Sequence, residues 1–193
     1  MNPSEVRGVL EDKGAILHGH FQLSSGRHSD LFVQKFRVLE HPRLAQRFGG
    51  SIADAFGSEF DVVASPAVGA IVLGFATALA ADARMIFAER EGGEMRFRRG
   101  FELEPRARTL IVEDVITTGG SAAEIVELVR TAGAEPVGVG VLIDRGDPAR
   151  PQSFGVPVRS LLKLEMESWD PAECPLCAEG RPLTDPGSRR VMP

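Results

Sequence analysis

The sequence is poor in cysteine, in long apolar runs and in positive charge. Its two cysteines, Cys174 and Cys177, are too few for a disulfide framework. The most hydrophobic stretch, residues 68–81, is too short to cross a membrane, and the polar residues 1–12 do not resemble a signal peptide. A net charge of −5 disfavours binding to nucleic acid. We therefore expect one globular, cytoplasmic domain of 193 residues without membrane or nucleic-acid partners.

What the sequence does contain is centred on residues 110–133, LIVEDVITTGGSAAEIVELVRTAG. The apolar run at its start is rich in β-branched residues, which is typical of a strand buried on both faces of a parallel sheet. Glu113 and Asp114 interrupt this run, and a helical pattern follows the glycines. Ser121 and Glu124 have the spacing of a capping box. The segment therefore predicts a strand, an acidic turn, a hydroxyl-rich loop and a helix.

The loop between this strand and helix, residues 117–121, has the composition of an anion site. Its backbone amides and short hydroxyls lie at the positive end of a helix dipole, where a phosphate monoester is favoured. Glu113 and Asp114 suit hydroxyls or a metal on the same ligand, so a sugar phosphate would satisfy both halves. A simple helix cap is the alternative, but a cap needs one hydroxyl and this loop supplies three. No P-loop occurs, and Gly138-Val139-Gly140 lacks the third glycine of a dinucleotide fingerprint.

The motif EDVITTGGS, residues 113–121, resembles the signature with which type I phosphoribosyltransferases bind PRPP, 5-phospho-α-D-ribosyl 1-diphosphate. Residues 16–34 resemble the N-terminal segment of one branch, the orotate phosphoribosyltransferases. The matching residues are Gly19, Phe21, Leu23, Ser25, Gly26, Ser29 and Phe32. Ser24 stands where many members carry a lysine, so no lysine role is transferred. The resemblance extends over almost the whole chain.

This resemblance implies an α/β fold, with a twisted, mostly parallel sheet flanked by helices. A small hood of approximately residues 1–40 and 156–193 would lie above the carboxyl edge of a core of approximately residues 41–155. The pattern alone predicts a hairpin with its turn at residues 24–26, but this does not account for the polar cluster of residues 27–30. Residues 156–164 are expected to return toward the hood.

The resemblance also implies a set of site residues. For PRPP they are Glu113, Asp114, Thr117, Thr118, Gly119, Gly120 and Ser121, with Ala67, Val68 and Gly69 holding pyrophosphate. For orotate they are Ser25, Gly26, Phe32, Thr117 and Arg145, and the residues assigned to catalysis are Arg90, Arg99 and Asp114. Mg²⁺ would bridge pyrophosphate and ribose oxygens, largely through the ligand and water.

Three of these assignments have plainer alternatives. The small-residue loop 65–70 lacks the lysine that some members carry, so it holds pyrophosphate by its amides or is only a tight connection. Residues 89–100, with two glycines and four arginines, are a solvated surface loop or the family's mobile lid, which crosses to the neighbouring subunit of a homodimer. Many members carry lysines and a histidine in this lid, and this chain does not. Arg145 either pairs locally with an aspartate or recognises the orotate carboxylate, for which a guanidinium is suited.

The C-terminal segment carries the pair Cys174 and Cys177 in C-x-x-C spacing. This pair supplies two ligands, whereas a tetrahedral zinc site needs four, and no histidine lies nearby in the sequence. A two-fold dimer could bring two pairs together. We favour a reduced structural pair over a zinc site.

The function predicted from these observations is orotate phosphoribosyltransferase, which forms orotidine 5′-monophosphate and pyrophosphate from orotate and PRPP in pyrimidine biosynthesis. Two alternatives are a purine phosphoribosyltransferase and a non-enzymatic regulator that senses PRPP. The N-terminal SGRHS segment and Arg145 disfavour the first. The lid-like loop, the negative charge and the lack of a helix-turn-helix pattern disfavour the second.

Overall fold

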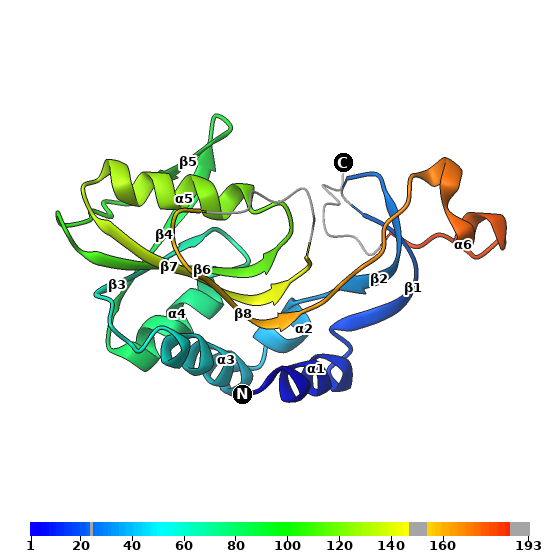
Figure 1. The fold of residues 1–193 in the computed structure, drawn as a ribbon, viewed down its shortest axis with the longest axis horizontal. Helices are drawn as coiled ribbons and strands as arrows, with labels where there is room; N and C mark the ends of the chain where they lie inside the picture. The colour runs from blue at the N-terminus through cyan, green and yellow to red at the C-terminus, as the bar shows by residue number, and fades with distance from the viewer. Residues whose placement is uncertain (24, 147–153, 186–193) are drawn as a thin grey trace.

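A six-stranded sheet in the order β5-β4-β3-β6-β7-β8 forms the centre of the protein in this computed structural model, which describes residues 1–23, 25–146 and 154–185 (Figure 1). Its strands are β3 (Val62–Pro66), β4 (Arg84–Glu91), β5 (Glu94–Phe97), β6 (Arg108–Ile116), β7 (Glu135–Asp144) and β8 (Val158–Lys163). All neighbours pair in parallel except β5, which is antiparallel to β4. The predicted α/β fold with a mostly parallel sheet is confirmed.

Helices cover both faces of this sheet (Figure 1). They are α5 (Gly120–Thr131) on one face and α3 (Pro42–Ala55) and α4 (Ile71–Ala81) on the other. Each face has its own apolar cluster, because the central strands are buried on both sides. Gly138 and Gly140 permit α3 to approach β7 closely, since a Cβ atom there would lie 2.2 Å from Phe56 and 2.5 Å from Ile52. These glycines therefore serve helix packing.

The N-terminal residues form helix α1 (Pro3–Asp12), a separate hairpin of β1 (Ile16–Gln22) and β2 (His28–Val33), and the short helix α2 (Phe36–Leu39). A capping box between Asn2 and Glu5 begins α1, which buries Val6 and Leu10 in the core. The predicted turn is present: the amide of Leu23 donates to the carbonyl of Arg27 (2.8 Å), and Gly26 has φ +82°. Ser24 itself lies outside the described residues.

The C-terminal segment differs from the expectation in its first part. We placed residues 156–193 with the hood, but Val158–Lys163 forms β8, the outer parallel strand of the main sheet. The chain then leaves the core and reaches the β1–β2 hairpin, where the 3₁₀ turn η1 (Pro171–Glu173) and the one-turn helix α6 (Pro175–Ala178) lie (Figure 1). The apolar pattern of residues 156–164 predicts an extended segment, but it does not show whether this segment joins the edge of the main sheet or the hood.

The arginine-rich stretch after β4 also differs from the predicted loop. Glu89 to Glu91 extend β4, Gly92 and Gly93 form the tip with φ +60° and +92°, and β5 returns antiparallel. Positive φ at both tip residues favours glycine, as in tight hairpin turns. The two glycines therefore form the tip of a hairpin. Among the described residues, no helix has the length and apolar character needed to span a bilayer.

Candidate active site

A cavity of about 220 Å³ opens at the carboxyl end of β6, where the strand passes into α5. Parallel α/β sheets commonly bind ligands at this edge. The lining residues come from the hairpin, the end of β6 and the start of α5. They are Arg90, Glu113, Val115, Ile116, Thr117, Thr118, Gly119, Gly120, Ser121, Ala122 and Glu124. All five predicted loop residues and one predicted carboxylate thus meet in one place.

The start of α5 leaves its first amides without a side-chain cap. Gly119 is the N-cap residue with φ +83°, and no side chain bonds the helix start. The predicted capping box of Ser121 and Glu124 is therefore wrong. Glu124 instead accepts from Arg90 Nη2 (2.7 Å) and from the amide of Met95 (3.2 Å), so it holds the hairpin against α5. The helix dipole and the loop amides are directed toward the cavity, as an anion site requires.

The two carboxylates point to opposite sides of β6, because successive strand residues alternate. Glu113 lines the cavity. Asp114, which is 2 % exposed, forms an ion pair with Lys35 (Oδ2 to Nζ, 2.7 Å) on the other side. We had assigned both carboxylates to the ribose; the structure gives them different neighbours.

Burial, and after it the negative charge of neighbouring Asp114, raises the pKa of Glu113 to about 8. The Glu113 side chain therefore carries a proton near neutral pH in the free protein. A protonated carboxyl can donate one hydrogen bond and accept another, which suits a hydroxyl-bearing ligand. A strongly raised pKa in a cavity is also typical of a functional site.

The loop after β3 lies against Asp114 and Lys35. A Cβ atom on Gly69 would lie 2.2 Å from Asp114 Oδ2 and 2.7 Å from Lys35 Nζ, so only glycine allows this approach. Val68 is 75 % exposed, and the Ala67–Val68 peptide bond is cis. This second predicted anion loop therefore has an ammonium group beside it, although it contains no lysine.

Sequence reasoning missed Lys35. The residue precedes α2, about 80 positions from Asp114, and belongs to no recognisable motif. Only the fold brings its ammonium to the edge of the sheet. The one local signal was the position of Lys35 two residues after the end of the hood strand β2.

The two arginines assigned to catalysis have different surroundings. Arg90 lines the cavity and binds Glu124. Arg99 lies outside the cavity lining and forms two bonds with Glu89, Nε to Oε2 (2.9 Å) and Nη2 to Oε1 (2.8 Å). Arg90 is thus near the phosphate loop of its own chain, whereas Arg99 is held on the hairpin surface.

The candidate orotate residues lie around the cavity rather than in its lining. Arg145 follows β7, and its amide donates to the carbonyl of Ile116 (3.0 Å), so it stands beside the end of β6. Ser25 and Gly26 are exposed at the tip of the hood hairpin, and Phe32 packs near Phe21 with ring centroids 5.8 Å apart. Of this group, only Thr117 lines the cavity.

Comparison with known proteins agrees with this geometry. The family described as phosphoribosyl transferase domain matches residues 37–170. The orotate phosphoribosyltransferase of Caldanaerobacter subterraneus subsp. tengcongensis is 44 % identical over 192 residues, covering 99 % of this chain and 100 % of that protein. The chain belongs to the orotate phosphoribosyltransferase family.

Solved orotate phosphoribosyltransferases share its fold. The enzyme of Aeropyrum pernix is 27 % identical with a TM-score of 0.71, covering 82 % of this chain and 93 % of that one. The enzyme of Mycobacterium tuberculosis in complex with PRPP is 25 % identical with a TM-score of 0.65, covering 84 % and 96 %. The family assignment from the acidic strand and its loop is confirmed.

Proposed function

We propose that this chain transfers the ribose 5-phosphate group of PRPP to orotate, giving orotidine 5′-monophosphate and pyrophosphate. The bond from ribose C1 to pyrophosphate oxygen breaks, a bond from C1 to orotate N1 forms, and the N1 proton is released. The observation that carries this proposal is the cavity at the end of β6, which joins a buried carboxyl to an uncapped helix start. This combination fits a sugar phosphate better than a phosphate alone.

In this proposal, residues 117–121 and the first amides of α5 hold the 5′-phosphate, and the side chains of Glu113 and Asp114 hold the ribose hydroxyls. The transition state resembles a ribosyl oxocarbenium ion, so catalysis consists mainly of positioning, charge stabilisation and exclusion of water. Glu113, once ionised on ligand binding, is suited to accept a hydrogen bond from a ribose hydroxyl. Asp114 stays close to the pyrophosphate loop through Lys35 and Gly69.

The leaving pyrophosphate would bind the amides of Ala67, Val68 and Gly69, with Lys35 supplying the positive charge that the loop itself lacks. The Lys35 ammonium is only partly exposed, so its attraction for an anion is less screened than at an open surface. Arg90 would add a second charge from the hairpin, and Arg99 a third. Thr117, Ser25, Gly26 and Phe32 would surround orotate, and Arg145 would bind its carboxylate.

Mg²⁺ fits the donors at this site, because Glu113, which lines the cavity, provides the hard oxygen ligand that the ion prefers. We propose that Mg²⁺ would bind at this site together with PRPP and would neutralise charge on the leaving group. Ionisation of Glu113 would accompany binding, since a nearby cation opposes the effect of burial on its pKa.

We further propose that the enzyme is a homodimer formed through α4. One side of this helix and the preceding loop exposes Val68, Val72, Phe75 and Leu79 at 42–75 % of their surface. Their spacing of three or four residues makes one continuous apolar strip, which a monomer rarely leaves in water. The strip continues into the pyrophosphate loop, so a partner there would lie beside the active site.

A turnover assay tests the reaction. Loss of orotate absorbance should require both PRPP and Mg²⁺, and the products should be orotidine 5′-monophosphate and pyrophosphate in equal amounts. Adenine, hypoxanthine and guanine offered in place of orotate should give no product. Product from a purine would favour the purine alternative, and tight PRPP binding without turnover of any base would favour a regulator.

A further inference from the structure

Four potential metal ligands lie together outside the candidate active site, where the hood hairpin meets the C-terminal segment. They are His20 of β1, His28 of β2, and Cys174 and Cys177 at the start of α6 and within it. One ligand atom from each lies within 4.8 Å of all the others. His20, His28 and Cys174 are buried, and Cys177 is exposed.

Four of the six distances between these atoms are close to the edges of a tetrahedron around one zinc ion. Zinc lies about 2.0–2.1 Å from a nitrogen ligand and about 2.3 Å from a sulfur ligand, which gives edges of roughly 3.4 Å between nitrogens and 3.6 Å between nitrogen and sulfur. His20 Nε2 lies 3.0 Å from His28 Nδ1, 3.4 Å from Cys174 Sγ and 3.7 Å from Cys177 Sγ. Cys177 Sγ lies 3.3 Å from His28 Nδ1.

The second nitrogen of His20 has the partner that a metal-bound histidine needs. His20 Nδ1 lies 2.9 Å from the carbonyl oxygen of Arg181. A carbonyl can only accept, so Nδ1 carries the proton and Nε2 presents its lone pair to the cluster. Such a hydrogen bond to a backbone carbonyl is typical of histidines that bind zinc.

Backbone hydrogen bonds hold the two halves of the cluster together. His28 and Trp169 exchange two bonds (2.8 and 2.9 Å), and the amide of Thr184 donates to the carbonyl of His20 (2.8 Å). The ligands therefore come from two segments fixed on either side of the cluster, the hairpin and residues 169–184.

We propose that these four side chains bind one Zn²⁺ in a closed Cys₂His₂ site that fastens the C-terminal segment to the hood. A tetrahedral set of two thiolates and two imidazoles selects zinc, and four protein ligands leave no open position for catalysis. A two-iron cluster with the same ligand types holds histidines and cysteines on different irons. Here each histidine lies within 3.7 Å of Cys177, which fits a single ion.

A metal site here would stabilise the C-terminal segment, which buries few apolar side chains. Between residues 165 and 185, only Cys174 and Leu176 are buried apolar residues. Arg27 and Ser29 of the hood make polar contacts with the segment, and metal binding is a direct source of folding free energy for such a region.

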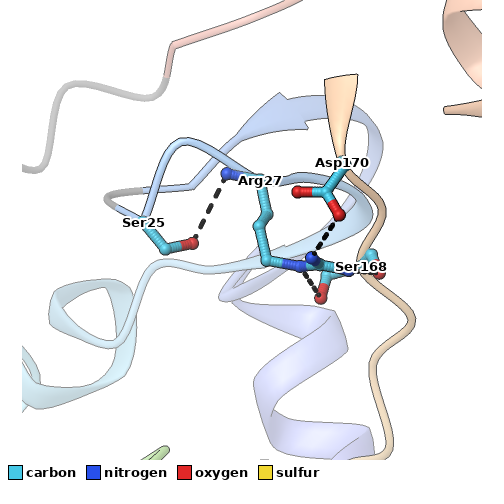
Figure 2. Close-up of polar contacts among 4 residues, drawn as sticks. All are labelled: Ser25, Arg27, Ser168 and Asp170. Atoms are coloured by element: carbon cyan, nitrogen blue, oxygen red, sulfur yellow. Dashed lines mark hydrogen bonds and ion pairs between the residues drawn. The ribbon is translucent and has the colours of Figure 1, made fainter. Parts of the chain in front are cut away.

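The metal site would also position the turn between β1 and β2. Figure 2 shows Arg27, next to His28, reaching the segment from the hairpin: its Nε donates to Ser168 Oγ (3.1 Å) and its Nη1 to Asp170 Oδ2 (3.0 Å). The amide of Arg27 also lies 3.5 Å from Ser25 Oγ. The zinc ion therefore acts on the segment proposed to contact orotate, as a positioning element. Of the polar cluster at residues 27–30, Arg27, His28 and Ser29 take part in these contacts.

The test is metal analysis of the full chain, purified without chelators or an affinity tag that binds metals. We expect about one zinc per chain in the wild type. Cys177→Ser and His28→Ala should retain at least fivefold less, and the matched control His18→Ala, an exposed histidine on the same strand as His20, should keep wild-type content. Zinc bound equally by all four proteins would overturn the proposal, as would iron with sulfide.

Cobalt substitution supplies a readout that does not depend on folding yield. Co²⁺ added to metal-stripped wild-type protein should produce a thiolate-to-metal charge-transfer band and intense tetrahedral d–d bands, which Cys177→Ser should weaken. Added zinc should abolish these bands and protect both thiols from alkylation. A wild-type protein with no zinc and no cobalt bands, whether its thiols are free or oxidised, would show that the cluster is only a hydrogen-bonded one.

Discussion

The cavity at the end of β6 and the metal-ligand cluster in the hood differ in how the chain builds them and in their effect on stability. The cavity comes almost entirely from consecutive residues, 113–124, with Arg90 added by the neighbouring hairpin. The cluster joins residues up to 157 positions apart. The cavity contains a buried carboxyl with a raised pKa and an uncapped helix start, both of which cost stability until a ligand binds. In the cluster, by contrast, the side chains of His20, His28, Cys174 and Cys177 already contact one another, and His20 also contacts the carbonyl of Arg181.

This contrast makes opposite predictions for the removal of charge. Neutralising a side chain in the cavity should lower activity, and neutralising Glu113 should also raise the stability of the free protein. Removing a ligand from the cluster should lower metal content and stability. The following changes test the cavity side of the comparison, and the metal analysis above tests the other side.

The largest effect is expected for Glu113→Gln. The folded-state pKa of Glu113, about 8, exceeds its ordinary value of 4.5, so the folded protein keeps a proton that the unfolded chain loses between these pH values. Wild-type stability from this source is complete below pH 4.5 and decreases as the pH rises to about 8. The glutamine has no proton to lose. The variant should therefore become more stable than wild type at high pH, by up to about 5 kcal/mol.

Denaturant unfolding near pH 5 and pH 9 measures this difference. The free energies of unfolding of the two proteins should be closest at the lower pH and diverge as the pH rises. A variant that is less stable than wild type at both pH values would mean that Glu113 is a structural residue. The same variant should lose activity, which a purely structural residue would not require.

Asp114→Asn is expected to reduce kcat/KM by roughly 10- to 100-fold. A charge-assisted hydrogen bond contributes about 1.5–3 kcal/mol, and the amide cannot replace the carboxylate at the ribose or keep its ion pair with Lys35. Steady-state kinetics with both substrates measures the change. The control is Asp54→Asn, an exposed aspartate on α3. Wild-type kinetics in a folded Asp114→Asn protein would contradict the assignment.

Arg145→Ala is expected to raise KM for orotate about tenfold while changing KM for PRPP much less. The loss of one forked donor to a carboxylate has about this magnitude. Arg43→Ala, at an exposed site on α3, controls for the loss of positive charge. Equal increases in both KM values would place Arg145 outside the orotate site.

Lys35→Met is expected to raise KM for PRPP approximately fivefold and to change KM for orotate little, which is the reverse of the effect of Arg145→Ala. The ammonium beside Gly69 is the charge that we assign to pyrophosphate, and methionine keeps most of its length. Lys13→Met, at the end of α1, is the matched control. An unchanged KM for PRPP would leave Lys35 as only the partner of Asp114.

The sequence predicted the cavity well because its information is local. The apolar strand, the loop composition and the helix pattern of residues 110–133 need no distant contact, and the structure places the loop as expected. The capping box was wrong because the S-x-x-E pattern does not show that Glu124 has a stronger partner in Arg90. Lys35, His20 and His28 could not be placed, because only tertiary folding brings them to Asp114 and the cysteine pair. The sequence showed only the two cysteines of the possible metal site, because the two histidines beside them are far away in the chain.

The smallest effect, and the sharpest test of the dimer, concerns the two hairpin arginines. Arg90 lines the cavity of its own chain, whereas Arg99 is held on the outer surface of the hairpin by Glu89. Arg99 follows β5, an edge strand of the sheet, and its side chain is 62 % exposed, so a partner subunit can reach it. We therefore expect that Arg90 serves its own active site and Arg99 the neighbouring one.

Subunit mixing separates these roles, given that each single variant is impaired alone. Arg99→Ala mixed with Asp114→Asn forms heterodimers in which one cavity keeps Asp114 and receives Arg99 from its partner, so about a quarter of wild-type activity should return at random assortment. Arg90→Ala mixed with Asp114→Asn should recover none, because both residues belong to one cavity. Recovery in the second mixture would assign Arg90 to the partner. If the mixture of Arg99→Ala and Asp114→Asn recovers no activity after verified subunit exchange, or if sedimentation shows a monomer, each hairpin acts only within its own chain. Arg99 would then be a surface residue whose only role is its contact with Glu89.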